Sequence, residues 1–257
     1  MFDSGIGGLS VLRALRAELP HERWVYFADA AHAPYGERDA SAVRERALAI
    51  ATELRAAHGI KALVVACNTA TAAGVHALRQ AHPDLPVIGL EPALKPAVAL
   101  TRTGHVAVLA TRATLASPKF ATLLAGVARD VQVTRQPCDG LAAAIEAGDA
   151  AAVAALCRRY TVEAARHGTR PGEIDTVVLG CTHYPFASDA LRDALGPGIT
   201  LVDSAGPVAR QTRRVLAAAG LLAPPAPDAG HVTWRSSGAL EPLLNAATRW
   251  LPQAVTA

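Results

Sequence analysis

Short runs of apolar and β-branched residues alternate along the chain with longer stretches in which apolar residues recur at helical spacing. The runs predict strands at 24–28, 62–66, 86–89, 105–110, 131–135, 176–179 and 199–202. The stretches predict helices at 9–19, 40–58, 71–82, 117–127, 150–167, 188–195 and 208–219. This alternation is typical of α/β proteins, in which helices flank mainly parallel sheets. After a proline-rich surface loop at 222–230, we expect a short strand at 231–234 and a closing helix at 241–250.

The strand ends of the two halves can be paired at a nearly constant offset, which indicates an internal repeat. Four pairs align at offsets of roughly 108 to 114 residues, among them 64–69 with 178–183. We interpret them as two similar, pseudo-twofold-related domains, 1–92 plus 208–257 and 93–207, with an active site in the cleft between them. The alternative is that any two α/β segments can be aligned loosely.

Composition and charge exclude several classes of protein. Of the 257 residues, 51% are hydrophobic and 18% are charged, which is typical of a packed globular chain and not of a disordered one. The longest apolar run, 150–157, is far shorter than the roughly 20 residues of a membrane helix, so no membrane association is expected. A net charge of +3 without charge blocks gives no support to nucleic-acid binding. The N-terminus resembles no secretory signal, so we expect a cytoplasmic protein with reduced cysteines.

Two of the four cysteines stand where chemistry is expected. Cys67 and Cys181 each follow a predicted strand and precede polar residues. In parallel α/β sheets, ligands bind at the carboxyl ends of strands, where helix N-termini favour anions. A thiol there can act as a base or a nucleophile. Cys138 and Cys157 are interpreted as core residues, and the wide spacing of the cysteines argues against a metal site or a disulfide framework.

Two polar turns are candidate binding loops. The glycine-rich turn that begins at Asp3 and Ser4 would let a ligand approach the backbone closely, although its spacing matches no nucleotide-binding motif. Asp3 could tune a neighbouring thiol or bind an ammonium group, and a helix N-cap is an equally good interpretation. Tyr35 and Gly36 lie in a second loop that could contact a ligand.

Four motifs occur in the order Phe2-Asp3-Ser4-Gly5-Ile6-Gly7-Gly8-Leu9-Ser10-Val11, Pro34-Tyr35-Gly36, Ala66-Cys67-Asn68-Thr69-Ala70 and Leu179-Gly180-Cys181-Thr182-His183-Tyr184-Pro185. Together they resemble the motifs of the glutamate racemases, and the resemblance covers nearly the whole chain. Aspartate racemases share the two cysteines but lack the Asp-Ser-Gly opening and the Cys-Thr-His-Tyr-Pro ending.

The resemblance implies a cofactor-independent interconversion of L- and D-glutamate, without a metal, by two bases that exchange a proton with the α-carbon. Removing the proton needs a base on one face, and inversion needs an acid on the other. By resemblance, Cys67 acts on D-glutamate with help from Asp3. Cys181 acts on L-glutamate with help from His183 and Glu146. The resemblance assigns substrate binding to Asp3, Ser4, Tyr35, Gly36, Asn68, Thr69, Thr114, Thr182 and His183.

The chain departs from the family in two places. Relatives carry several residues ahead of the Asp-Ser-Gly turn that form a central strand, whereas only Met1 and Phe2 precede Asp3 here. We therefore expect this strand to be missing, the true start to lie upstream, and an extended chain to be more soluble and more active. Ala113 and Asp139 replace an expected glycine and proline, which weakens the assignment of Thr114 and Glu146.

Other functions remain open from the sequence. An aspartate or hydantoin-type racemase would keep both cysteines and change the side-chain pocket. A pyridoxal-phosphate racemase needs a Schiff-base lysine, and Lys61, Lys95 and Lys119 stand in no recognisable cofactor motif. A non-catalytic two-lobed binding protein for a small molecule is the alternative from another class. Glutamate racemases commonly form homodimers and supply D-glutamate for peptidoglycan, so both properties are expected by resemblance.

Overall fold

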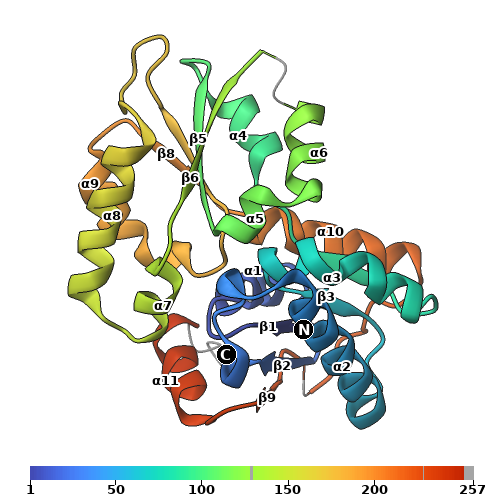
Figure 1. The fold of residues 1–257 in the computed structure, drawn as a ribbon. Coiled ribbons are helices and arrows are strands. Elements are labelled where there is room, and N and C mark those ends of the chain that lie inside the picture. The colour runs from blue at the N-terminus through green and yellow to red at the C-terminus, as the bar shows by residue number, and fades with distance from the viewer. Residues whose placement is uncertain (128–129, 228, 252–257) are drawn as a thin grey trace. The chain divides into compact units, whose positions relative to one another are not determined.

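The computed structural model describes residues 1–127, 130–227 and 229–251. The chain forms two compact units, one built from 1–90 with 205–257 and the other from 91–204 (Figure 1). Asp228, within the predicted loop at 222–230, and residues 252–257 of the predicted first domain lie outside the described residues. Among the described residues, no helix is both long enough and apolar enough to cross a membrane.

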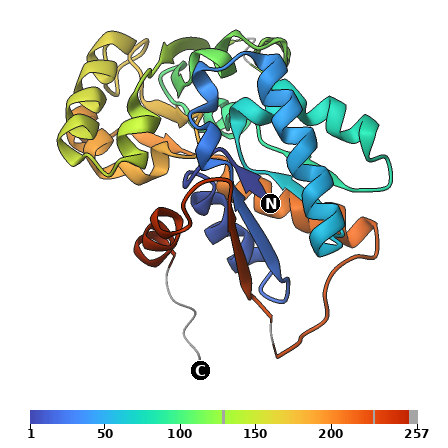
Figure 2. The same ribbon diagram turned by 60° about the horizontal axis from the view of Figure 1, so that its bottom comes forward.

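The first unit contains a parallel sheet of five strands in the order β4-β3-β1-β2-β9. The strands are β1 (Phe2–Asp3), β2 (Trp24–Ala28), β3 (Leu63–Val65), β4 (Val87–Gly89) and β9 (Val232–Ser236). The helices are α1 (Leu9–Glu18), α2 (Ala40–His58), α3 (Asn68–Ala81), α10 (Ala205–Ala218) and α11 (Glu241–Trp250), with 3₁₀ turns η1 (Ala30–His32) and η2 (Tyr35–Glu37). Figure 2 shows β9 lying along β2 near the end of the chain.

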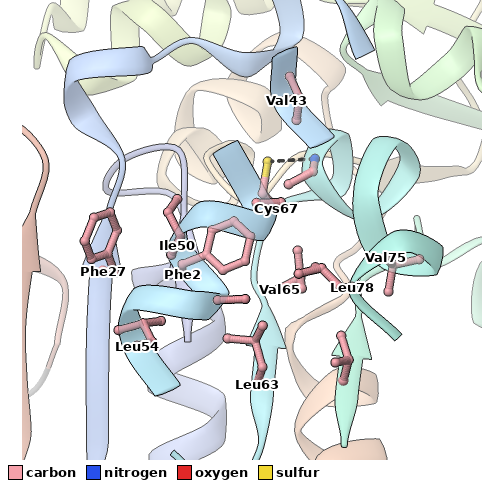
Figure 3. Packing of buried hydrophobic residues seen from close by; sticks show 14 of the residues in the cluster. Phe2, Phe27, Val43, Ile50, Leu54, Leu63, Val65, Cys67, Val75 and Leu78 are labelled. Carbon is pink, nitrogen blue, oxygen red and sulfur yellow. Dashed lines mark hydrogen bonds between the residues drawn. The ribbon is translucent and has the colours of Figure 1, made fainter. Parts of the chain in front are cut away.

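The helices of this unit cover both faces of its sheet. The chain crosses from β1 to β2 in one direction along the sheet, and from β2 it crosses back past β1 to β3. Since parallel crossovers are right-handed, α1 and α2 lie on opposite faces. On the α2 face, Ile50 and Leu54 pack with Phe2 and Val65 in a cluster that reaches up to Cys67 (Figure 3). Helix α3 packs against α2, and α10 packs against α1.

The second unit contains a parallel sheet of four strands in the order β6-β5-β7-β8. The strands are β5 (His105–Ala110), β6 (Gln132–Pro137), β7 (Thr176–Leu179) and β8 (Thr200–Val202). The helices are α4 (Leu94–Leu100), α5 (Arg112–Ala116), α6 (Pro118–Val127), α7 (Leu141–Glu146), α8 (Ala150–Ala164) and α9 (Ser188–Leu195), with the 3₁₀ turn η3 (Tyr184–Ala187). Side chains that alternate along β5 and β7 point to the two faces, so Leu109 and Val177 pack with α7, α8 and α9, whereas Val108 and Val178 pack with α4 and α6.

The two sheets share one strand order, which confirms the α/β prediction of two similar parallel sheets. Read from β4, the first sheet runs β4-β3-β1-β2, and read from β8, the second runs β8-β7-β5-β6. β3 and β7, which the offset of 64–69 with 178–183 pairs, therefore occupy the same position in their sheets. The first sheet has β9 as an additional edge strand beside β2.

The expectation that the N-terminal central strand is missing is wrong for the residues present. Phe2 and Asp3 form β1, which pairs with both β2 and β3 and so occupies the middle of the sheet. Below it, a cavity of about 660 Å³ is lined by Met1 and by residues of both neighbouring strands, such as Val25 and Val64. Met1 also lies beside β2, where its N-terminal group donates to the carbonyl oxygen of Val25 at 2.7 Å and its own carbonyl oxygen accepts from the N–H of Phe27 at 3.0 Å.

Other differences concern helix starts and short helices. The predicted helix at 71–82 begins three residues earlier, at Asn68, because the Cys67 side chain caps it. The predicted helix at 117–127 is preceded by the short α5, and the helices α4 and α7 were not predicted. These short helices have few apolar repeats, so periodicity gives little signal for them.

Candidate active site

Cys67 follows strand β3 and caps helix α3. Its backbone is extended (φ −141°, ψ 125°), and its sulfur accepts a hydrogen bond from the N–H of Ala70 at 3.4 Å. Figure 3 shows the sulfur at the upper end of β3, above the apolar cluster. Because a helix N-terminus presents N–H groups and the positive end of the helix dipole, this position favours an anion.

Asp3 is the last residue of the neighbouring strand β1 and Ser4 follows it, so both lie at the same edge of the sheet as Cys67. Both residues are buried. The Asp3 carboxylate accepts a hydrogen bond from the N–H of Gly8 at 2.6 Å, directly before α1. A Cβ at Gly8 would lie 2.8 Å from the Cβ of Asp3, so this close approach requires glycine. The Asp3 carboxylate thus binds the N-terminus of helix α1, and it does so at the sheet edge where Cys67 lies.

Asn68 and Thr69 form the first turn of α3, and both are buried. The Asn68 Nδ2 group finds no hydrogen-bond partner among the described residues. Buried amide groups are usually paired, so a donor of this kind is available to a ligand. The sequence had placed these two residues before the helix and not within it.

Tyr35 and Gly36 lie in the turn η2. The Tyr35 hydroxyl donates a hydrogen bond to the carboxylate of Asp29 at 2.5 Å, and its ring packs in the cluster that contains Cys67. Burial and the carboxylate of Asp29 raise the pKa of Tyr35 well above its ordinary value. The phenol therefore stays protonated, and its proton is committed to Asp29.

The sequence analysis did not single out Asp29, although it directly follows the predicted strand at 24–28. It is fully buried and accepts hydrogen bonds from Arg46 and Tyr35, with His32 also within reach. Burial by itself would raise the pKa of Asp29, but the hydrogen bonds from Arg46 and Tyr35 lower it to about 2. Its position at a strand end is the signal that could have identified it.

In the second unit, Cys181 follows strand β7 and stands next to an imidazole. The Cys181 sulfur lies 3.7 Å from His183 Nδ1, and His183 Nε2 lies 2.6 Å from Glu146 Oε1. Glu146 ends helix α7, 37 residues away along the chain. The three residues therefore form one chain of polar contacts from the carboxylate through the imidazole to the thiol.

The charge of His183 is set by its two neighbours. Burial alone would lower the pKa of His183, but the hydrogen bonds to Cys181 and Glu146 raise it well above its ordinary value. A protonated imidazole donates from both ring nitrogens, so it can bind the carboxylate on one side and the sulfur on the other. The Cys181 sulfur therefore has a positively charged hydrogen-bond donor beside it.

Thr182 and Thr114 lie at the same edge of the second sheet as Cys181. Thr182 follows Cys181 directly and is buried. Thr114 lies in α5, where its hydroxyl is 3.0 Å from the hydroxyl of Thr111, the residue directly after β5. Because β5 and β7 are neighbouring strands, Thr111 and Cys181 occupy equivalent ends.

Cys138 and Cys157 lie inside the apolar core of the second unit. Both are buried, and burial raises the pKa of Cys157 to about 11 and that of Cys138 further. Thiols with such pKa values stay protonated at neutral pH. In the part of the chain that the structure describes, no three or more His, Cys, Asp or Glu side chains are grouped as a metal site would require.

Each unit thus carries one group of predicted residues at the carboxyl ends of its strands. In the first unit the group consists of Asp3, Ser4, Tyr35, Gly36, Cys67, Asn68 and Thr69. In the second it consists of Thr114, Glu146, Cys181, Thr182 and His183.

Comparison with known proteins identifies the family. The profile of the Asp/Glu/hydantoin racemase family matches residues 9–212. A glutamate racemase of Pseudomonas syringae pv. tomato is 51% identical over 227 residues, which cover 87% of this chain and 80% of that protein.

Two solved structures are similar along almost the whole chain. A glutamate racemase isoform from Bacillus anthracis has a TM-score of 0.83 and 31% identity, covering 97% of this chain and 91% of that one. The Escherichia coli glutamate racemase, solved with L-glutamate and the activator UDP-MurNAc-Ala, has a TM-score of 0.82 and 35% identity, covering 97% and 93%. The chain therefore belongs to the Asp/Glu/hydantoin racemase family, and within it to the glutamate racemases.

Proposed function

We propose that this chain interconverts L- and D-glutamate by moving the α-proton between two thiols. The observation that carries the proposal is that each unit places one cysteine at the carboxyl end of a buried parallel strand, Cys67 after β3 and Cys181 after β7. Polar, buried residues follow each cysteine, and the relatives of similar sequence are glutamate racemases. Two acid–base groups of the same kind suit a reaction whose two directions are mirror images.

The reaction needs no group other than the two thiols to carry the proton. With L-glutamate bound, the Cys181 thiolate takes the α-proton, and the electron pair of the C–H bond stays on the α-carbon as a carbanion. The Cys67 thiol then donates its proton to the opposite face, which forms D-glutamate and leaves Cys67 as the thiolate. The reverse reaction uses the same steps with the roles exchanged.

At Cys181, the charges of the neighbouring residues support the thiolate. The His183 imidazolium, which Glu146 holds at 2.6 Å, favours a negative charge on the sulfur. As the thiolate becomes a thiol, this interaction weakens, so the imidazolium stabilises the state from which L-glutamate reacts. Glu146 acts through His183 and holds the ring in position.

At Cys67, the N-terminus of helix α3 supports the thiolate in place of a histidine. The Ala70 N–H donates to the sulfur, and Asp3 lies at the end of the adjacent strand. We assign Asp3 an assisting role for the Cys67 half-reaction, in which its carboxylate binds the α-ammonium group of the substrate. The two thiolates are therefore stabilised by different groups. At Cys67 the group is a helix N-terminus, and at Cys181 it is an imidazolium.

The remaining polar residues are proposed to hold the substrate. Glutamate has two carboxylates and one ammonium group, and the hydroxyl and N–H donors of the site match the carboxylates. The unpaired Nδ2 group of Asn68 is the donor that most needs a partner. The residues proposed to bind the substrate are Ser4, Tyr35, Gly36, Asn68, Thr69, Thr114, Thr182 and His183.

We propose further that the D-glutamate enters peptidoglycan synthesis in the cytoplasm, as is typical of the family, and that the enzyme forms a homodimer. These proposals rest on similarity to glutamate racemases. Sedimentation equilibrium measures the oligomeric state directly. A deletion strain that requires D-glutamate, and that this chain rescues, would support the biological role.

The test of the activity uses hydrogen exchange with solvent. The purified protein is incubated separately with L- and D-glutamate in deuterated water, and optical rotation and α-deuterium are followed by NMR. Racemisation from both sides, with deuterium entering mainly the product enantiomer, supports the two-thiol mechanism. Activity towards aspartate or a hydantoin, but not glutamate, would instead favour the alternative racemases.

Substitution separates an enzyme from a binding protein. Cys67→Ser and Cys181→Ser should each abolish racemisation, because serine cannot take up or donate the proton at a similar pKa. Cys157→Ala is the matched control, since this thiol lies on helix α8 and points into the apolar core of the second unit. A binding protein would keep its affinity in both serine variants and show no exchange with solvent even in the unmodified chain.

A further inference from the structure

One buried carboxylate joins the segment that carries Tyr35 and Gly36 to the rest of the first unit. Asp29 Oδ2 accepts from the Tyr35 hydroxyl at 2.5 Å and from Arg46 Nε at 3.0 Å. Asp29 Oδ1 accepts from Arg46 Nη2 at 2.7 Å and lies 3.0 Å from His32 Nδ1. These partners come from η2, α2 and η1, so three elements meet at one side chain.

The backbone of Asp29 is fixed to the strand that carries a proposed catalytic residue. Its N–H donates to the carbonyl oxygen of Asp3 at 2.9 Å, and its carbonyl accepts from the N–H of His32 at 2.9 Å. The segment 30–37 is therefore tied at its start to the end of β1 and, through the carboxylate, to helix α2. A bidentate Arg–carboxylate pair has a fixed orientation, so Arg46 also sets the direction in which Asp29 faces Tyr35.

The hydrogen bond to Asp29 determines what Tyr35 can do. Its hydroxyl proton points to the carboxylate, so the hydroxyl cannot also donate to a ligand. The ring is 1% exposed and packs in the cluster that contains Cys67. The phenol thus holds the segment against the core, and a contact of Tyr35 with the substrate has to come from its backbone.

We propose that Asp29 is a positioning residue for the reaction, which holds Tyr35 and Gly36 in the place where they bind the substrate. The inference rests on the proposed function, because that function assigns Tyr35 and Gly36 to the substrate. Asp29 itself does not touch the reacting atoms. Its removal should loosen the segment 30–37 and weaken substrate binding while leaving the two thiols in place.

The test compares Asp29→Asn with Asp84→Asn. Asp84 forms an equivalent two-bond pair with Arg55, which also lies on helix α2, but this pair is exposed and remote from the segment. Asp29→Asn should raise KM for both enantiomers on the order of 10–100-fold, as misplaced binding groups do, and change kcat less than about threefold. Asp84→Asn should leave both constants unchanged.

Amide hydrogen exchange provides a second measurement that does not depend on activity. In Asp29→Asn, exchange should accelerate in residues 30–37 and stay unchanged in the remainder of the first unit. Unchanged KM, or acceleration spread over the whole unit, would overturn the proposal, because the role would then be absent or merely structural. If the unmodified protein fails to racemise glutamate, the proposed function fails, and the exchange measurement alone decides whether Asp29 holds the segment.

Tyr35→Phe is the second variant in case Asp29→Asn does not fold. It removes only the hydroxyl that binds Asp29 and keeps the Asp29–Arg46 pair intact. The same rise in KM and the same local acceleration of exchange are expected, at smaller magnitude. Unchanged values for both measurements would contradict the proposal.

Discussion

Replacing Glu146 by glutamine removes the charge that holds His183 protonated and keeps the size of the side chain. In the structure, Glu146 Oε1 lies 2.6 Å from His183 Nε2, and this contact helps to raise the pKa of the imidazole. A hydrogen bond to a charged group contributes about 1.5–3 kcal/mol. Without this contact, the pKa of His183 should fall.

The kinetic consequence follows from the thiolate at Cys181. Once the imidazole loses its proton, the sulfur loses the positive charge beside it, so the negative charge that the reaction places on Cys181 is stabilised less. At a pH above the lowered pKa of His183, kcat/KM should fall by about 10–100-fold. This factor is the loss of about 1.5–3 kcal/mol expressed as a ratio of rates. Because the two enantiomers are equally stable in water, kcat/KM must fall by the same factor in both directions.

The assay follows kcat/KM for L- and D-glutamate by circular dichroism over pH 6 to 10. The alkaline limb of the profile should move to lower pH in Glu146→Gln. Glu163→Gln is the matched control, since Glu163 pairs with Arg159 on the surface of the same unit. A profile and a rate equal to those of the unmodified protein would refute the assignment of Glu146.

The free energy of unfolding should also depend on pH through the protonation of His183. The folded pKa of His183 lies above its unfolded value, so its contribution to the free energy of unfolding is complete below a pH of about 6.5. It is lost as the pH rises through the folded pKa. In urea denaturation, the unmodified protein should therefore exceed Glu146→Gln in stability more at pH 6.5 than at pH 10. An equal difference at both pH values would contradict this sign.

Three further predictions concern the first unit. Gly8→Ala should lower stability by about 1–3 kcal/mol and reduce activity, because its Cβ would lie 2.8 Å from the Cβ of Asp3; urea denaturation and kcat/KM measure the two effects. The pKa of Asp29 is lowered to about 2, so its stabilisation is present above pH 4 and is lost as the pH falls towards 2. The stability difference from Asp29→Asn should shrink accordingly between pH 5 and pH 3. Four β-branched residues added before Met1 should raise Tm by at least about 3 °C, because they would fill the cavity of about 660 Å³ and replace an ammonium group whose pKa burial lowers to about 5. A Gly-Ser-Gly-Ser addition, as the control, should raise Tm less.

The location of the candidate site residues could be predicted because apolar runs mark the strands, and parallel α/β sheets bind ligands at the carboxyl ends of their strands. Cys67, Cys181 and the polar residues that follow them stand directly after apolar runs, and a run of that kind forms a strand whatever its neighbours are. The internal offset also predicted which strands correspond, and the two sheets share one strand order. These are local or periodic signals, and they need no knowledge of the packing.

Contacts between residues far apart in the sequence could not be predicted from local pattern. Glu146 reaches His183 across 37 residues, and Asp29 reaches Arg46 across 17. The resemblance to glutamate racemases suggested the first contact, but nothing suggested the second. Whether a carboxylate near a strand end is exposed or becomes the centre of a buried network depends on which helix packs above it.

The chain by itself determined the fold class, the internal repeat and the two candidate thiols, because hydrophobic periodicity and strand ends are properties of short segments. Only the tertiary structure decided that Cys67 caps helix α3, that Phe2 and Asp3 form a central strand, and that Asp29 holds Tyr35. The physical reason is that hydrogen bonds within a segment depend on neighbouring residues, whereas burial and pKa depend on what distant segments bring to the same place.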